Sequence, residues 1–490
     1  MSKRVETSAS RSAPTGDTNA KGVHRRDLMK LGLAGLGAAM VGAAARSEAA
    51  QQALRSPAHH RDLGPAPELP FVAPPMDVVR VGYVGVGGMG SAHVRNLLGI
   101  EGAEIRAVCD IVPDKIERIQ EWCADAGQPI PTGYARDEHD FIRMCEEEDL
   151  DLVYTATPWR WHVPVCVAAM ENGKHAATEV PAAVTIDGCW QLVETAEKYQ
   201  KHCLMMENCN YDRNELMVLN MVRQGVLGEV LHGECGYLHD LRGIKFADEG
   251  EGLWRRAHSI ARNGNLYPTH GLGPIMQCMD IERGDRMDYL VSMSSPSRGL
   301  QDFARENYPP ASVKRQEMYR LGDVNTSMIM TALGRTIYVS HDTNLPRPYS
   351  RIHMVQGTKG LFQGYPPRVY VEGLGRPHRW IDAEGYDTQE GEHFDLQQVR
   401  DEFDHPLFTE LEEMSRGAGH GGMDFIEDYR LIKCLREGLP TDFNVYESAS
   451  ISAVSELSEI SVANGGRPVE FPDFTRGRWK SWPQFGIVHA

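Results

Sequence analysis

Residues 78–90 read VVRVGYVGVGGMG, a β-rich run that leads into the glycine pattern G-x-G-x-x-G. The apolar first half predicts a buried strand, and Ser91–Leu98 predicts the helix that follows it. In such a unit Gly85 permits a tight turn, Gly87 lets the backbone approach a pyrophosphate, and Gly90 lets helix and strand pack closely. The stretch therefore indicates a dinucleotide-binding unit.

A carboxylate ends the next predicted strand. Asp110 follows the run Glu104–Cys109 and comes twenty residues after Gly90. An acid at this position accepts both ribose hydroxyls of a dinucleotide and repels a 2′-phosphate, which favours NAD over NADP. The alternative interpretation is that Asp110 only caps the helix expected at Pro113.

Further strands and helices alternate along the next hundred residues. Strands are predicted at 152–157 and 174–178, with helices from His162 and over 187–202. This alternation predicts a parallel, doubly wound Rossmann sheet.

Two loops follow the carboxyl ends of these strands. They read TPWRWH over 157–162 and EVP over 179–181. Because ligands of such sheets bind beyond the carboxyl ends of the strands, we expect both loops to border the nicotinamide.

From about residue 208 the alternation gives way to β-rich runs. These runs are 230–238, 289–293, 326–332, 336–340 and 351–356. They predict an α+β domain with a largely antiparallel open sheet and C-terminal helices. We therefore expect an NAD-binding Rossmann domain over 77–207 and a substrate-binding domain over 208–490.

The first 76 residues have the pattern of an export leader and a linker. The pair Arg25-Arg26 precedes an uncharged run over 31–45, which is too short to span a bilayer. The pattern predicts a twin-arginine signal peptide over 1–50, with an uncleaved anchor or a disordered basic tail as the alternative. Residues 51–76 are rich in proline and predict an extended linker. We therefore expect a folded protein that the twin-arginine machinery exports to the periplasm or outside the cell.

The composition narrows the class of partner. The 490 residues hold 51 Lys and Arg against 68 Asp and Glu, a net charge of −17, so nucleic acid is an unfavourable ligand. A small-molecule or glycan substrate fits better. The ten cysteines form no C-x-x-C pair, which argues against a disulfide framework and a structural zinc site, and we expect no metal. An open sheet face leaves room for a homo-oligomer.

The segment NGNLYPTHG over 263–271 places two titratable side chains close together. Tyr267 lies three residues before His270, ahead of a helix predicted over 274–279. Both are candidates for proton transfer, while the alternative for His270 is a helix cap.

Together these features resemble a known enzyme group. The Rossmann half with a Glu-x-Pro loop, followed by an open-sheet domain, resembles the Gfo/Idh/MocA oxidoreductase superfamily. Within it the chain resembles glycoside hydrolase family 109, the NAD-dependent α-N-acetylgalactosaminidases. The motifs that carry this resemblance are WRWH at 159–162, EV at 179–180, EN at 207–208, YPTH at 267–270 and GHGGMD at 419–424.

The resemblance implies roles for individual residues. Around NAD it places Gly88, Met89, Asp110, Trp159, His162, Glu179, Val180 and Asn208. Around the sugar it places Tyr237, Arg255, Tyr267, His270 and Tyr349. The choice between Arg255 and Arg256 stays open.

The resemblance also implies a reaction. A terminal α-N-acetylgalactosamine would be released by oxidation at C3, elimination across C1 and C2, addition of water and reduction, so tightly bound NAD would be regenerated in each turnover. His270 and Tyr267 would carry the proton transfers. The alternatives are an exported NAD-dependent sugar or polyol dehydrogenase and a non-catalytic NAD-binding sensor. Sugar dehydrogenases of the superfamily carry a Lys where this chain has Val180, which favours the hydrolase.

Overall fold

The computed structural model describes residues 52–55, 59–68, 71–388, 391–484 and 487, all of which belong to one compact unit. The predicted signal peptide, residues 1–50, lies outside the described residues. Among the helices that are described, none has the length and apolar character needed to cross a bilayer.

The first sheet has six parallel strands in the order β3-β2-β1-β4-β5-β6, which confirms the predicted doubly wound Rossmann fold. Its strands are β1 (Val79–Val84), β2 (Ala103–Cys109), β3 (Thr132–Tyr134), β4 (Leu152–Thr155), β5 (His175–Thr178) and β6 (Cys203–Met205). The order reverses between β1 and β4, and ligands of such sheets bind at this reversal.

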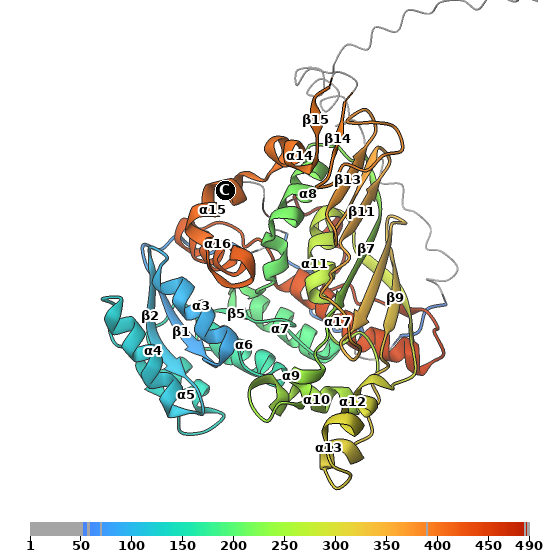
Figure 1. Cartoon of the computed structure of the whole chain (residues 1–490). Coiled ribbons are helices and arrows are strands. Elements are labelled where there is room, and N and C mark those ends of the chain that lie inside the picture. The colour runs from blue at the N-terminus through green and yellow to red at the C-terminus, as the bar shows by residue number, and fades with distance from the viewer. Residues whose placement is uncertain (1–51, 56–58, 69–70, 389–390, 485–486, 488–490) are drawn as a thin grey trace, which may run out of the picture. The chain divides into compact units, whose positions relative to one another are not determined.

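Helices connect these strands and cover the sheet (Figure 1). They are α3 (Gly88–Leu98), α4 (Pro113–Asp125), α5 (Asp140–Glu147), the short 3-10 helix η2 (Trp159–Trp161), α6 (His162–Glu171) and α7 (Ile186–Tyr199). Helix α3 begins three residues before the predicted Ser91, because Gly87 occupies its N-cap and the glycine motif itself forms the first turn. Buried on both faces, β1 and β4 are almost wholly apolar, as a central parallel strand requires.

The second sheet has eight strands in the order β13-β12-β11-β7-β10-β9-β8-β16. Its strands are β7 (Val230–Leu238), β8 (Met287–Ser294), β9 (Asn325–Thr331), β10 (Thr336–Asp342), β11 (Met354–Gly357), β12 (Gly360–Gln363), β13 (Arg368–Val371) and β16 (Val469–Glu470). Only the pair β7 and β10 is parallel, so the predicted, largely antiparallel sheet is confirmed. A separate hairpin joins β14 (Tyr386–Asp387) and β15 (His393–Phe394).

The strand predicted at 351–356 was placed too early. Ile352 and His353 have φ angles of 64° and 46°, a left-handed conformation that ends strand pairing, so β11 begins only at Met354.

Helices of the second half lie on one side of the large sheet, where α11 (Thr269–Cys278) packs on β7 and α17 (Val445–Ala463) on β8. The other helices are η3 (Asn208–Tyr211), α8 (Arg213–Arg223), α9 (Arg242–Phe246), η4 (Gly250–Leu253), α10 (Arg255–Ala261), α12 (Gly299–Asn307), α13 (Val313–Gln316), α14 (Leu396–Phe403), α15 (Pro406–Ser415), η5 (Gly419–Gly422), α16 (Met423–Glu437) and η6 (Arg478–Lys480).

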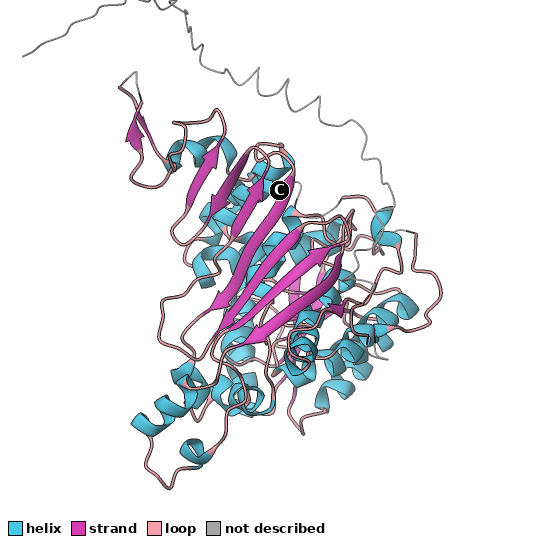
Figure 2. Ribbon diagram, turned by 90° about the vertical axis from the view of Figure 1, so that its right-hand side faces the viewer, coloured by secondary structure: helices cyan, strands magenta, loops and turns pink. Residues whose placement is uncertain are grey.

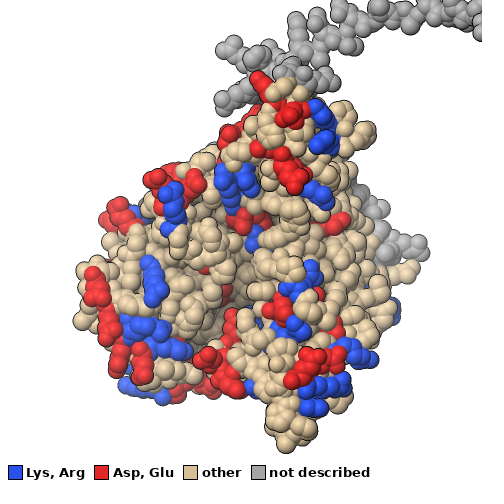
Figure 3. Space-filling model, in the orientation of Figure 1, with Lys and Arg blue, Asp and Glu red and all other residues tan. Residues whose placement is uncertain are grey.

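The opposite face of the large sheet is open, as Figure 2 shows. Met293 and Met328 lie exposed on two of its strands, at 65% and 38% of their full surface. The expected homo-oligomer stays a prediction. Figure 3 shows acidic and basic side chains interspersed on the face it displays, without an extended cationic patch there.

Helix α11 corrects the prediction of a helix over 274–279. It begins at Thr269, so His270 lies inside its first turn rather than ahead of it. Proline is common in the first turn of a helix. Pro274 instead lies inside the helix, where its missing N–H leaves the carbonyl of His270 without the usual partner four residues on.

The described part of the proline-rich segment 51–76 is held against the C-terminal end of the chain. The Leu54 amide donates to the Pro468 carbonyl at 2.8 Å, and the Leu54 carbonyl accepts from Glu470 at 3.1 Å. Trp482 donates from its indole nitrogen to the carbonyl of Pro67 at 3.3 Å. These contacts attach the segment to the folded unit.

Gly90 is the position of the glycine motif with the least space. A Cβ there would lie 2.0 Å from the Gly85 carbonyl oxygen, whereas a Cβ on Gly88 would meet no described atom within 4 Å. We expect Gly90→Ala to lower the free energy of unfolding by about 1–3 kcal/mol. Denaturant unfolding measures this, with Gly88→Ala as the matched control. Equal stability of the two variants would contradict the close packing of strand and helix.

Candidate active site

The glycine turn after β1 has the geometry that a pyrophosphate needs. Gly85 has a φ of +83°, and a Cβ on it would meet the backbone of Ala156 at 3.0 Å. A Cβ on Gly87 or Gly88 would meet no described atom within 4 Å, so the backbone is open to close approach there. Helix α3 has no acidic residue in its first turn, and no described side chain caps it. Its first N–H groups are therefore available to an anion, and the turn fits the dinucleotide that the sequence predicts.

Asp110 lies at the end of β2, beside this turn. Its two carboxylate oxygens accept hydrogen bonds from the amides of Val86 at 3.0 Å and Val112 at 2.9 Å, and Lys115 lies 3.6 Å away. Helix α4 begins at Pro113 with Val112 as its N-cap, so Asp110 is not the cap itself. Each carboxylate oxygen retains a second lone pair for a ribose hydroxyl.

Replacing Asp110 tests its role toward the cofactor. Asp110→Ser should weaken NAD binding and reduce the discrimination against NADP, because the variant can no longer accept two hydroxyls or repel a phosphate. Titration of NADH and NADPH by fluorescence measures both affinities. Asp114→Ser, in the first turn of α4, is the control. An unchanged ratio of the two affinities would mean that Asp110 only holds the backbone amides of Val86 and Val112.

Glu179, after β5, is held by a buried histidine from α3. Its Oε1 lies 2.7 Å from His93 Nε2, and its Oε2 accepts from the Val180 amide at 3.1 Å. The other ring nitrogen of His93 lies 2.8 Å from Asp428 of α16. Burial opposes a charge on this ring, but Asp428 and Glu179 raise the pKa of His93 well above its ordinary value. A buried imidazolium between two carboxylates therefore connects the Rossmann half to α16.

The 419–424 motif lies next to this cluster. Asp424 accepts from Asn208 Nδ2 at 2.6 Å and lies 2.7 Å from His420 Nδ1. Burial raises the pKa of Asp424, but the hydrogen bond with His420 lowers it, and the net pKa lies below its ordinary value. Asn208, expected beside NAD, is thus oriented by the C-terminal half.

The ring of His162, expected beside NAD, is held by two backbone carbonyls. Its ring is 1% exposed, and its nitrogens lie 2.7 Å from the carbonyl of Pro181 and 2.8 Å from that of Thr157. Burial lowers the pKa of His162. The side chain connects the two loops at the carboxyl ends of β4 and β5, so its ring nitrogens are not offered to a cofactor.

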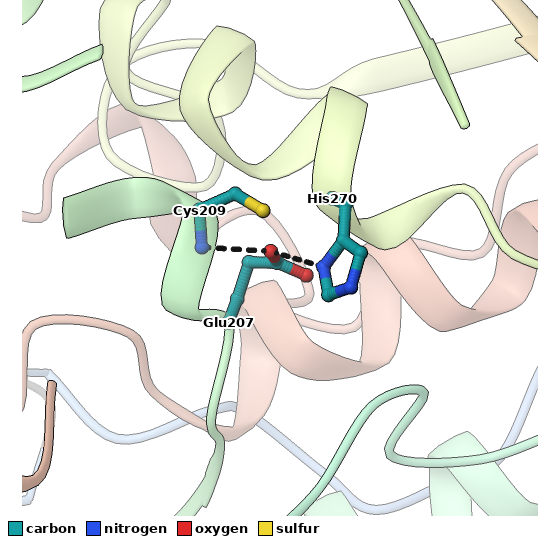
Figure 4. Close-up of side chains that lie close together, drawn as sticks. All are labelled: Glu207, Cys209 and His270. Atoms are coloured by element: carbon teal, nitrogen blue, oxygen red, sulfur yellow. Dashed lines mark hydrogen bonds and ion pairs between the residues drawn. The ribbon is translucent and has the colours of Figure 1, made fainter. Parts of the chain in front are cut away.

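Tyr267 and His270 form a hydrogen-bonded chain with Glu207. The Tyr267 hydroxyl lies 3.2 Å from His270 Nε2. His270 Nδ1 lies 2.8 Å from Glu207 Oε1, and Figure 4 shows this second pair. Glu207 is 1% exposed and also accepts from the amide of Cys209 at 3.2 Å. With Glu207 ionised, Nδ1 carries the proton and Nε2 is free to accept one. The arrangement is that of a general base oriented by a carboxylate.

The same residues meet the distance criterion for a metal site. Ligand atoms of Glu207, Cys209 and His270 lie within 4.8 Å of one another. Burial raises the pKa of the Cys209 thiol well above its ordinary value, which disfavours the thiolate that a metal needs. The hydrogen bond between Glu207 and His270 already accounts for their approach. The expectation of no metal stays a prediction.

Aromatic rings surround Tyr267 on its other sides. Tyr237 lies 4.6 Å and Trp159 5.7 Å from it between ring centroids, and the Arg255 guanidinium lies 5.2 Å from its ring. The ring of Trp159 also lies 5.0 Å from that of Trp254. Burial raises the pKa of Tyr267 well above its ordinary value, and that of Tyr237 to about 12. The structure thus groups Trp159, expected near NAD, with the sugar-side residues.

The structure separates the two neighbouring arginines. Arg255 is buried and lies 2.6 Å from Glu251, with its guanidinium over Trp159, Trp254 and Tyr267. Arg256 points away, because it donates to Glu317 at 3.0 Å and to the carbonyl of Lys245 at 3.2 Å. Arg255 is therefore the arginine of the site.

Tyr349 lies at the exposed border of this cluster. It is 36% exposed, and its ring lies 6.0 Å from that of Tyr237 and 5.1 Å from that of His239. Its hydroxyl accepts from Arg351 at 3.4 Å. The predicted sugar-side residues thus come together from β7, α10, α11 and the segment before β11.

Three supporting residues were missed from the sequence. Glu207 was noted only as part of a motif, and His93 and Arg118 were not considered. Arg118 donates to the carbonyl of Val86 at 2.9 Å and to Ser91 at 2.8 Å, which braces the glycine turn. The one available signal was the position of Glu207, two residues after the buried strand β6.

Comparisons with known proteins agree with this geometry. Residues 211–481 match a family model described as "Glycosyl hydrolase 109, C-terminal domain", and residues 79–207 match "Oxidoreductase family, NAD-binding Rossmann fold". A Glycosyl hydrolase family 109 protein of Solibacter usitatus is 46% identical over 462 residues, 93% of this chain and 98% of that protein. Another from Shewanella sp. (strain W3-18-1) is 48% identical over 442 residues, 88% of this chain and 94% of that protein.

Solved structures show the same fold. An NAD binding oxidoreductase from Klebsiella pneumoniae has a TM-score of 0.61 at 15% identity, over 80% of this chain and 99% of that one. Levoglucosan dehydrogenase in complex with NADH and L-sorbose has a TM-score of 0.59 at 19% identity, over 81% and 100%. At these identities the likeness is one of fold.

Proposed function

Because the chain belongs to glycosyl hydrolase family 109 and carries an NAD-binding Rossmann half, we propose that it releases terminal α-N-acetylgalactosamine by an NAD-dependent route. The proposed order is oxidation at the sugar C3, elimination across C1 and C2, addition of water and reduction. NAD stays tightly bound and is regenerated in every turnover.

The observation behind this proposal is that the carboxylates around the site are already bonded to other side chains. A conventional glycosidase needs two carboxyl groups facing the scissile bond from opposite sides. Here Glu207 is bonded to His270, Glu179 to His93 and Glu251 to Arg255. Each of these three acids already orients a base or a cation, so the reaction needs another source of activation.

The residues of the chain supply the proton transfers. Tyr267 passes its hydroxyl proton to His270 Nε2 as it takes one from the substrate, and Glu207 stabilises the imidazolium that forms. Arg255 places a positive charge beside Tyr267, where negative charge on the substrate oxygen develops. When bound at the glycine turn, NAD⁺ supplies reversible removal of hydride from C3.

An aryl-glycoside assay separates this function from its rivals. The chain should release nitrophenol from the α-N-acetylgalactosaminide without net formation of NADH. A sugar or polyol dehydrogenase would accumulate NADH with free sugars and release no nitrophenol. A non-catalytic NAD-binding protein would do neither, and either of these outcomes contradicts the proposal.

We also propose that residues 1–50 direct the folded, NAD-loaded protein through the twin-arginine machinery to the periplasm or outside the cell. Changing Arg25 and Arg26 together to Lys should leave the precursor in the cytoplasm, because the machinery reads the arginine pair. Cell fractionation and immunoblotting measure its location. Undiminished export of the double variant would contradict the proposal.

A further inference from the structure

Glu207, the partner of His270, lines a small internal cavity. Its wall is formed by the end of β6 and η3 on one side and by α16 on the other. It has room for about one water molecule. The aromatic rings that surround Tyr267 are not among the residues that line it.

Three buried polar side chains line this cavity with unsatisfied acceptors. Glu207 Oε2, Asn210 Oδ1 and both carboxyl oxygens of Glu427 have no hydrogen-bond partner among the described residues. These side chains are between 1% and 3% exposed. Because buried acceptors without donors are costly, the cavity requires hydrogen-bond donors.

Counting hydrogens limits what the cavity contains. One water brings two hydrogens for four acceptors, so two of these acceptors stay without a donor. A proton on Glu427 changes one acceptor into a donor to the water oxygen, so the two water hydrogens then face three acceptors instead of four. A metal cation is disfavoured, because the guanidinium of Arg430, paired with Asp442 at 2.7 Å, lines the same cavity.

The charges around Glu427 favour its neutral form. Burial raises the pKa of Glu427 well above its ordinary value; His93 opposes the shift, while Asp428 and Glu179 add to it. The titratable and charged groups that face Glu427 from the neighbouring elements are Tyr83, His93, Tyr154, Glu179, Glu207, Tyr211, Asp424, Asp428, Arg430 and Asp442.

We propose that Glu427 is a positioning residue that carries a proton and, through one buried water, donates a hydrogen bond to Glu207 Oε2. This stabilises the ionised form of Glu207, which in turn orients His270. The inference rests on the proposed function for its effect on catalysis, but the protonation of Glu427 is measurable without any substrate.

The pH profile of kcat/KM tests the effect on the active site. Glu427→Gln retains a donor, so its kcat/KM should stay within about twofold of the wild-type value. Glu427→Leu removes the donor and makes ionised Glu207 less stable, so the acid limb should move to higher pH by about one unit. The matched control is Glu282→Gln, a buried carboxyl that Ser450 contacts at 2.6 Å and that lies outside the cavity. Its acid limb should not move.

Infrared spectroscopy of the resting protein tests the protonation directly. Subtracting the Glu427→Gln spectrum from the wild-type spectrum at pH 7 should leave the carbonyl band of a protonated carboxylic acid. This measurement needs neither a folded Glu427→Leu protein nor a substrate. It therefore separates failure of the inference from failure of the proposed function. Absence of the band, an unmoved acid limb in folded Glu427→Leu, or loss of activity in Glu427→Gln would each overturn the inference.

Discussion

Replacing His270 by alanine should lower kcat/KM on the aryl α-N-acetylgalactosaminide by about 10²- to 10⁴-fold, the contribution of a positioned acid or base. His270 is the only described residue that bonds both Tyr267 and Glu207, at 3.2 and 2.8 Å, so its loss separates the hydroxyl from the carboxylate. The side chain lies at the first turn of α11 and is not part of the apolar core, so we expect the variant to fold. Initial rates and circular dichroism measure the two properties.

Two further variants show whether the chain acts as a unit. Glu207→Gln should also slow the reaction, and combining it with His270→Ala should cost little more than His270→Ala alone, because residues of one relay are not additive. His232→Ala is the matched control, since this histidine of β7 contacts Thr336 and lies outside the site. A His270→Ala enzyme with kcat/KM within tenfold of the wild type would exclude His270 as the base.

Removing NAD should abolish hydrolysis altogether. The glycine turn and Asp110 provide the binding geometry, while the carboxylates Glu179, Glu207 and Glu251 are each already bonded within the protein. Direct cleavage of the bond needs two free carboxyl groups on opposite sides of it, and these three are already engaged. Protein unfolded, freed of nucleotide and refolded should be inactive in the aryl-glycoside assay.

Adding NAD⁺ back should restore activity, without stoichiometric build-up of NADH. NADP⁺ is the matched control, because the position of Asp110 opposes a 2′-phosphate. Full activity of cofactor-free protein would contradict the proposed route and leave the Rossmann half as a scaffold.

The Rossmann half was readable from the sequence because its signals are local. The glycine motif, the preceding apolar strand and Asp110 all lie within 33 residues, counted from Val78 to Asp110. Strand β7 was predicted with its observed bounds, because the β-rich run at 230–238 begins and ends with the strand itself. The largely antiparallel second sheet was also predicted from local signals, namely the successive β-rich runs after residue 208.

Other features depend on contacts between distant residues and left no local signal. His93 and Asp428 are 335 positions apart, and Glu207 meets His270 across 63. Arg255 and Arg256 could not be told apart for the same reason, because Glu317, which binds Arg256, lies 61 positions further along the chain. For α11 the predicted start at Pro274 was wrong, because the helix begins five residues earlier, at Thr269, and continues through the proline.

The isotope content of the product at C2 tests the proposed route most directly. Hydrolysis in deuterated water, followed by mass spectrometry and proton NMR of the released sugar, measures it. Removal of the C2 proton during elimination predicts deuterium at C2 in every product molecule and none in unreacted N-acetylgalactosamine incubated with the enzyme-free buffer. A product with its original hydrogen at C2 would contradict the account and point to direct displacement at C1.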